Sequence, residues 1–162
     1  NFLEAQVRAK IARVKTEMRM LATALEAYRI DSTAYPPFFA SATIRIQPTS
    51  ARLRPLTTPI AYTTSIPDDV FAAAANDPNY DSYDYVDEES PERYFDPPHS
   101  YQWTYGYAWI MNSMGPDLFN QYRSLGYPDM LYDPTNGTVS WGDIIRPGPR
   151  GKYYQDVFIP LY

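Results

Sequence analysis

The chain of 162 residues contains no cysteine and only one histidine, His99. Without cysteine it can form no disulfide framework, no thiolate zinc site and no cysteine nucleophile. The single histidine excludes metal sites built from two histidines, and it leaves a serine–histidine–acid triad only one possible base. No run of residues approaches the roughly 20 apolar residues that span a bilayer. We therefore interpret the composition as that of a structural or binding protein rather than an enzyme.

Positive charge is also scarce, because 14 Lys and Arg face 19 Asp and Glu, a formal net charge of -5. This balance argues against nucleic acid as a partner, since phosphate binding needs a clustered positive surface. The charge is uneven: residues 1–30 carry a net +3, so the remaining 132 residues carry -8. Most of this negative charge lies between Asp77 and Asp96, where eight acids face only Arg93. We expect a solvated helix face and a solvated acidic loop, or, alternatively, head-to-tail packing of copies.

The first segment has the pattern of a long amphipathic helix, which we predict over residues 1–33. Its apolar residues recur every three or four positions, the spacing that places them on one helical face. They are Leu3, Val7, Ile11, Val14, Met18, Leu21, Leu25 and Tyr28. No proline or glycine interrupts the segment before Pro36. We expect this stripe to pack on the protein's own core; a coiled-coil seam is the alternative.

The rest of the chain predicts a small antiparallel sheet. Residues 34–100 are rich in proline and tyrosine and predict long connecting loops, with a helical turn at residues 53–56 and one or two short strands near residues 83–86. Alternating aromatic residues over 101–109 predict the best strand, and Asn136-Gly137 predicts a hairpin. The expected fold class is α+β, one domain over residues 1–162, with residues 101–162 forming the sheet and a C-terminal loop.

Several segments together resemble the type IV pilin and pseudopilin superfamily, most of all the G-type major pseudopilin of type II secretion. They are residues 1–10; residues 18–28 with 31 and 35–37; residues 56–62 with 66–71; and residues 113–117 with 132–144. The resemblance spans the chain from end to end and covers about half of its residues. It implies a pilin-like fold with a long N-terminal helix on a small sheet.

What the resemblance implies for function is a filament subunit that does no chemistry itself. Such subunits polymerise with copies of themselves and with other pseudopilins into a periplasmic pseudopilus that helps export folded proteins through the outer-membrane secretin. Their precursors are cut by a prepilin peptidase. Before assembly, an apolar helix that would lie upstream of Asn1 anchors them in the inner membrane beside the secretion platform, with this domain in the periplasm. The alternative within the superfamily is a type IV pilin or minor pilin for adhesion, motility or DNA uptake.

The resemblance also implies a calcium site in the C-terminal loop. The family's aspartates correspond to Asp117, in the Gly115-Pro116-Asp117 turn, and to Asp143, with Ser113 and Ser140 as further oxygen donors. Calcium takes six to eight oxygen ligands, so two carboxylates with carbonyls and water would suffice. The chain departs from the family in having Leu118 where glycine is usual, and in a longer segment between the motifs. The alternative is that both aspartates cap backbone amides in turns.

A second functional class is open because 16 tyrosines and three tryptophans could form a sugar-stacking surface. This would make the chain a carbohydrate-binding module. The alternation over residues 101–109 instead favours a packed sheet face.

Overall fold

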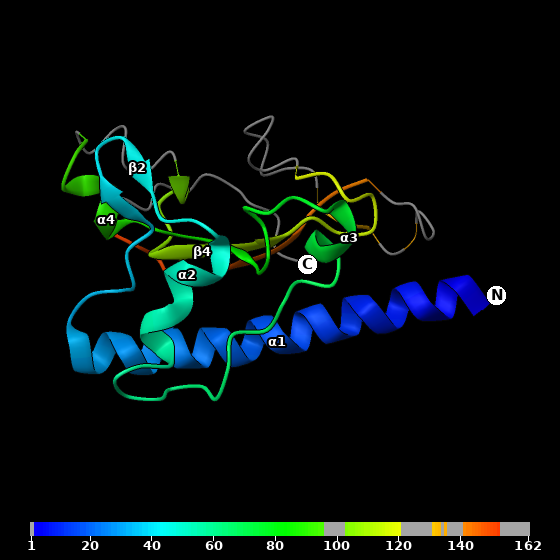
Figure 1. Cartoon of the computed structure of the whole chain (residues 1–162), viewed down its shortest axis with the longest axis horizontal. Coiled ribbons are helices and arrows are strands. Elements are labelled where there is room, and N and C mark those ends of the chain that lie inside the picture. Colours follow the sequence, from blue (N-terminus) through cyan, green and yellow to red (C-terminus); the bar gives the residue numbers. More distant parts are fainter. Residues whose placement is uncertain (1, 96–102, 121–130, 134, 136–140, 153–162) are drawn as a thin grey trace.

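The computed structural model describes residues 2–95, 103–120, 131–133, 135 and 141–152, and its longest element is the helix α1 (Phe2–Ser32) (Figure 1). The fold is mixed α+β, as the sequence predicts. The remaining elements are β1 (Phe39–Ser41), β2 (Ile44–Arg45), α2 (Thr49–Leu53), η1 (Arg54–Leu56), α3 (Ala72–Ala75), β3 (Asp84–Asp87), α4 (Glu89–Glu92), β4 (Trp109–Ser113) and β5 (Ile144–Pro147).

The apolar stripe of α1 is buried along the middle of the helix. The buried members are Ile11, Val14, Met18, Leu21 and Leu25, which confirms the predicted core-facing stripe. Towards the N-terminus the cover ends: Val7 is only half-buried, and Leu3 is 63% exposed. Figure 1 shows this end of α1 (blue) extending past α3. The body therefore packs on α1 from about Ile11 onwards.

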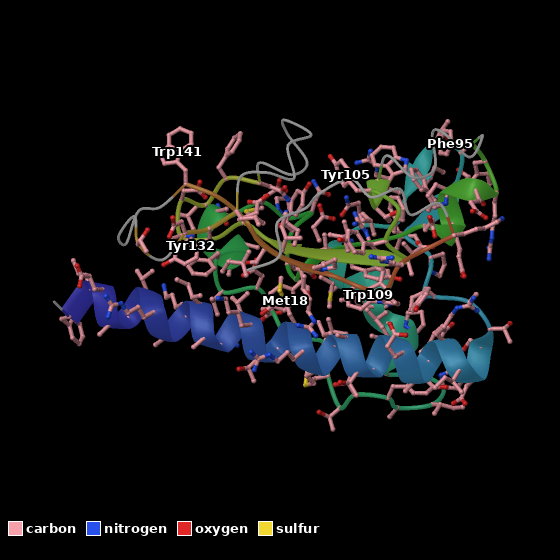
Figure 2. The ribbon with its side chains drawn as sticks, turned by 180° about the vertical axis from the view of Figure 1, so that it is seen from behind. Met18, Phe95, Tyr105, Trp109, Tyr132 and Trp141 are labelled. Carbon is pink, nitrogen blue, oxygen red and sulfur yellow. The ribbon has the colours of Figure 1, made fainter. Side chains whose placement is uncertain are left out.

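Three antiparallel strands in the order β3-β4-β5 form the central sheet, and β1 pairs with β2 in a separate hairpin. One face of the sheet packs on α1 through Tyr85, Trp109 and Met111. Figure 2 shows Met18 and Trp109 between α1 and the sheet. The other face packs through Val86 and Ile110 on an aromatic cluster that includes Phe38 and Phe39. Because both faces are covered, β3 and β4 are buried at every position.

Glu26 ties α1 to the rest of the molecule by hydrogen bonds. Its Oε1 accepts from the indole Nε1 of Trp109 at 2.8 Å, and both of its oxygens accept from the hydroxyl of Tyr35. Burial, followed by the negative charge of Glu26, raises the pKa of Tyr35 well above its usual range. Tyr35 therefore stays a neutral donor, and the C-terminal half of α1 is held against the sheet by polar as well as apolar contacts.

The strand predicted over residues 101–109 is wrong for the part that the structure describes. Residues 103–108 form turns and one isolated bridge, and β4 begins only at Trp109. Tyr105 and Gly106 both have positive φ values, 52° and 80°, which interrupt the pleat. The helical turn at residues 53–56 and the strand near residues 83–86 are confirmed. The predicted hairpin at Asn136-Gly137 lies outside the described residues.

The acidic stretch between Asp77 and Asp96 was expected to be a solvated loop, and the structure corrects this expectation. Asp84, Asp87 and Glu88 are 4%, 0% and 3% exposed. Asp84 pairs with the buried Arg52 at 2.5 Å, and Glu88 accepts a hydrogen bond from the backbone amide of Lys152 at 2.8 Å. The stretch is buried because it contributes β3, the strand between α1 and the aromatic cluster. The basic residues in the first 20 positions of α1 are exposed, as expected.

Candidate metal centre

The structure brings the two predicted calcium ligands, Asp117 and Asp143, into neighbouring loops. Asp117 follows β4 and Asp143 immediately precedes β5, so the pairing of these strands places both loops at one end of the sheet. The Asp117 Oδ2 atom accepts a hydrogen bond from the amide of Gly142 at 3.2 Å, and its Oδ1 accepts from the amide of Phe119 at 3.2 Å. Both oxygens thus contact backbone amides, which is the turn-capping role that the sequence left open.

Two glycines allow the loops to approach so closely. Gly115 has φ +69°, and a Cβ atom there would lie 2.5 Å from the carbonyl oxygen of Gly142. Gly142 has φ +123°, and a Cβ atom there would lie 2.5 Å from the carbonyl carbon of Leu131. Any side chain at either position would collide with rigid backbone. The juxtaposition of Asp117 with the Gly142-Asp143 segment therefore depends on glycine at both positions.

Asp143 lies at one end of a chain of buried polar side chains. It is 1% exposed, and its Oδ2 accepts a hydrogen bond from the Asn112 side-chain amide at 3.2 Å. The same amide donates to Oδ1 of Asn120 at 3.0 Å, and Asn120 in turn lies 3.5 Å from Oδ2 of Asp84. The Asn112 Oδ1 atom is buried and, within the described part of the chain, accepts no hydrogen bond. Sequence reasoning missed Asn112 because nothing in its local pattern signals this position.

The predicted serine ligand Ser113 is buried beside another carboxylate. Ser113 is the last residue of β4, is 1% exposed, and its hydroxyl lies beside the buried carboxylate of Asp69. Burial raises the pKa of Asp69, while the Ser113 hydroxyl and backbone amides act in the opposite direction. Ser140 lies outside the described residues. Leu118, at one of the two places where the chain departs from the pseudopilin pattern it resembles, has φ 60°, a conformation that glycine adopts more readily.

The donors at this site are the hard oxygens that calcium prefers. They are the carboxylates of Asp117 and Asp143 and the unsatisfied amide oxygen of Asn112. Within the described residues, no group of three or more His, Asp or Glu side chains is arranged to hold a metal ion. Carbonyl or water oxygens would therefore have to complete a calcium shell here. Beside the site, Trp141 is 73% exposed and points outward (Figure 2).

A second buried carboxylate, Asp87, accepts three hydrogen bonds at the end of β3. Its Oδ1 accepts from the amide of Phe38 at 3.0 Å and from the hydroxyl of Ser90 at 2.6 Å, and its Oδ2 accepts from the amide of Ser90 at 2.6 Å. Burial nevertheless raises the pKa of Asp87 to about 6. These bonds join the chain before β1 to the first turn of α4, so the residue acts as a structural bridge.

Among the described elements, none is a helix with the length and apolar character needed to cross a membrane. In the comparisons with known proteins, no family model, no curated protein and no solved structure matches the chain.

Proposed function

We propose that this chain is a structural subunit of a type II secretion pseudopilus, polymerising with copies of itself through α1. The observation that carries the proposal is the apolar stripe of α1, which continues in register beyond the body. Ile11 is 7% exposed, whereas Leu3 and Phe2 are 63% and 75% exposed. A helix with an apolar face that its own domain leaves uncovered is suited to packing against other helices.

The arrangement of the body supports the same proposal. The sheet packs along one side of α1 from Ile11 towards the C-terminal end of the helix, through contacts of Met18, Leu25 and their neighbours. This leaves the N-terminal part of α1 projecting to one side. Helices of several copies could bundle at the centre of a filament while the bodies remain outside. The subunit would then act by assembly and would do no chemistry.

The experiment that tests this function is a deletion of the gene in its own host. We expect exported proteins to accumulate in the periplasm of the deletion strain, and the full-length gene to restore their release. Overproduction of the full-length protein should yield filaments that shear from the cell surface and react with an antibody to this domain. Normal secretion with loss of adhesion, motility or DNA uptake would contradict the pseudopilus and favour a type IV pilin or minor pilin.

We also propose that the loops around Asp117 and Asp143 hold calcium in this subunit. The unsatisfied Asn112 Oδ1 atom and the carboxylates beside it support this proposal, because a bound cation would give a buried acceptor a partner. Calcium would join the loop after β4 to the loop before β5. Asp117 would contribute from the half-exposed side and Asp143 from the buried side.

Calcium is therefore expected to raise the thermal stability of the folded chain. At a free concentration of 100 times its dissociation constant, a single site adds about 2.7 kcal/mol, which raises the unfolding midpoint by several degrees. The measurement is thermal unfolding with calcium, with magnesium and with excess chelator. Asp117→Ala should abolish the shift, whereas Asp133→Ala, at an exposed turn, should retain it. An unchanged midpoint for the unmodified chain would refute the calcium site and leave the filament proposal intact.

A further inference from the structure

The helix α1 presents two different surfaces on either side of its buried stripe. Arg19 and Asp31 each lie six residues from the buried Leu25, in opposite directions along the chain. Because a helix turns about 100° per residue, Arg19 and Asp31 project roughly 120° to either side of the direction in which Leu25 projects from the helix axis. The step of twelve positions from Arg19 to Asp31 separates the two side chains by about 18 Å along the helix axis. The two flanks of α1 can therefore face two different neighbours.

The first flank holds a groove of about 340 Å³ between α1 and β5, which we term the cationic groove. Lys15, Arg19 and Arg146 supply its charge, Met18 and Pro147 supply apolar wall, and no acidic residue lines it. Within the part of the chain that the structure describes, the side chains of these three basic residues make no hydrogen bond or ion pair. The Nε atom of Arg146 is also buried without a partner. A buried guanidinium nitrogen without an acceptor is costly, so the groove is suited to an incoming anion.

The second flank is built by α1 together with residues 57–69, which pass beneath and across α1 between η1 and α3 (Figure 1). The hydroxyl of Tyr62 donates to Oδ2 of Asp31 at 2.7 Å, which fixes this segment against the helix and raises the pKa of Tyr62. Residues 57–69 contain no lysine or arginine. Asp31 is exposed, and so is the nearby apolar Ile60, at 57%. We term Asp31, Ile60 and Tyr62 the Asp31 surface.

We propose that the Asp31 surface of one copy docks in the cationic groove of the next copy. The carboxylate of Asp31 would meet Lys15, Arg19 and Arg146, and Ile60 would meet the apolar wall of the groove. Charge complementarity selects this pairing, because the groove carries three cations without an acid and the opposing surface carries an anion. The inference rests on the proposed filament function and names the contact between its subunits.

The two surfaces are different, so their contact is heterologous. A heterologous contact that does not close on itself produces an open chain of subunits rather than a two-fold pair. Within one molecule the two surfaces lie on opposite flanks and are offset along the axis. Each successive copy would therefore be both rotated and shifted along α1, which is the geometry of a helical filament.

The absence of cysteine from the chain makes a cross-linking test direct. Arg19→Cys and Asp31→Cys would be introduced singly and together into the full-length protein and oxidised in cells that make it. The two sulfurs of one molecule cannot join, because a disulfide requires Cα atoms less than about 7 Å apart. We expect a mixture of the single variants to yield cross-linked pairs only. The double variant should yield a ladder of multimers.

Matched controls distinguish specific cross-linking from cross-linking by random collision. They also distinguish failure of this contact from failure of the proposed filament function. Arg19→Cys combined with Asp133→Cys should give no ladder, because Asp133 is exposed elsewhere. Arg19→Asp should lower the yield of filaments about tenfold, and adding Asp31→Arg should restore it. Filaments that form by electron microscopy but never cross-link through residues 19 and 31 would overturn this contact and leave the filament function standing. If no multimer forms under any cross-linking chemistry, the proposed function fails and this inference fails with it.

Discussion

Replacing Asp84 with alanine is expected to lower the free energy of unfolding by about 3–5 kcal/mol. Asp84 is 4% exposed and pairs with Nη1 of Arg52 at 2.5 Å, and Arg52 is itself only 1% exposed. Removing the carboxylate leaves the guanidinium of Arg52 in the interior without its counter-charge. The carbonyls of Ile46 and Tyr85 remain as acceptors, but neither is charged. Urea denaturation at neutral pH measures the loss.

An exposed ion pair provides the control for this prediction. Arg13 pairs with Glu17 at 2.7 Å on the surface of α1, where the Arg13 side chain is 55% exposed. Arg13→Ala should destabilise the protein far less than Asp84→Ala, because solvent screens exposed pairs. The double variant Arg52→Met, Asp84→Ala should be more stable than Asp84→Ala alone, because it removes the uncompensated charge. If Asp84→Ala loses no more than Arg13→Ala, the pair contributes little to the fold.

Between pH 4 and pH 6, Asp87 is expected to make the protein less stable as the pH rises. Its pKa is about 6 in the folded protein against an ordinary value of 3.8. In this range the folded protein holds a proton that the unfolded chain has released, so raising the pH favours unfolding. The difference of about two pKa units corresponds to roughly 3 kcal/mol of unfolding free energy. This contribution is present below about pH 4 and is lost once the pH rises above about 6. Denaturant titrations at half-unit pH intervals, on the unmodified chain and on Asp87→Asn, measure it.

The comparison with Asp87→Asn isolates this residue, since all other titrating groups are shared. The stability advantage of the unmodified chain over Asp87→Asn should shrink as the pH rises from 4 to 6.5. Asp133→Asn is the control of opposite sign, because hydrogen bonds from Thr135 lower the pKa of the exposed Asp133. Its difference curve should rise with pH only near and below the ordinary pKa of 3.8, and it should stay flat over the range in which the Asp87→Asn curve falls. A flat curve for Asp87→Asn would mean that the three hydrogen bonds offset the cost of burying the charge.

The sequence predicts α1 well because its signal is local. The three- and four-residue spacing from Ile11 to Leu25 determines one face, and no residue before Thr33 opposes a helix. The position at which the rest of the domain begins to bury the stripe, near Ile11, could not be predicted in the same way. Leu3 and Ile11 both belong to the stripe, and the extent of the rest of the domain along α1 decides which one is buried. The boundary between core and exposed stripe is therefore a tertiary property.

The strand and charge predictions failed where distant residues decide the structure. Alternating aromatic residues over 101–109 satisfy the period of a strand, but the left-handed backbone at Tyr105 moves the start of β4 to Trp109. Acidic residues near Asp84 resemble a solvated loop in isolation. The buried carboxylate of Asp84 has its counter-charge in Arg52, which lies 32 positions earlier. No local pattern identifies such a partner.

The candidate metal centre was predictable in part. Family resemblance pointed to Asp117 and Asp143, and the hydrogen bond from the Gly142 amide to Asp117 places their loops together. Asn112 was not predicted, because it reaches Asp143 only through the pairing of β4 with β5. Resemblance identifies residues that a motif contains, whereas a neighbour supplied by strand pairing becomes visible only once the register is known.

The position of the body along the side of α1 has a mechanical consequence for a filament of such subunits. The helix is one continuous rod from Phe2 to Ser32, and the sheet attaches to it laterally rather than interrupting it. A pull along the axis would therefore be borne by the backbone and hydrogen bonds of α1. The sheet, attached alongside, would travel with the rod without being stretched. Axial force in either direction would thus be transmitted along α1 of the proposed filament without deforming the loops of the subunit.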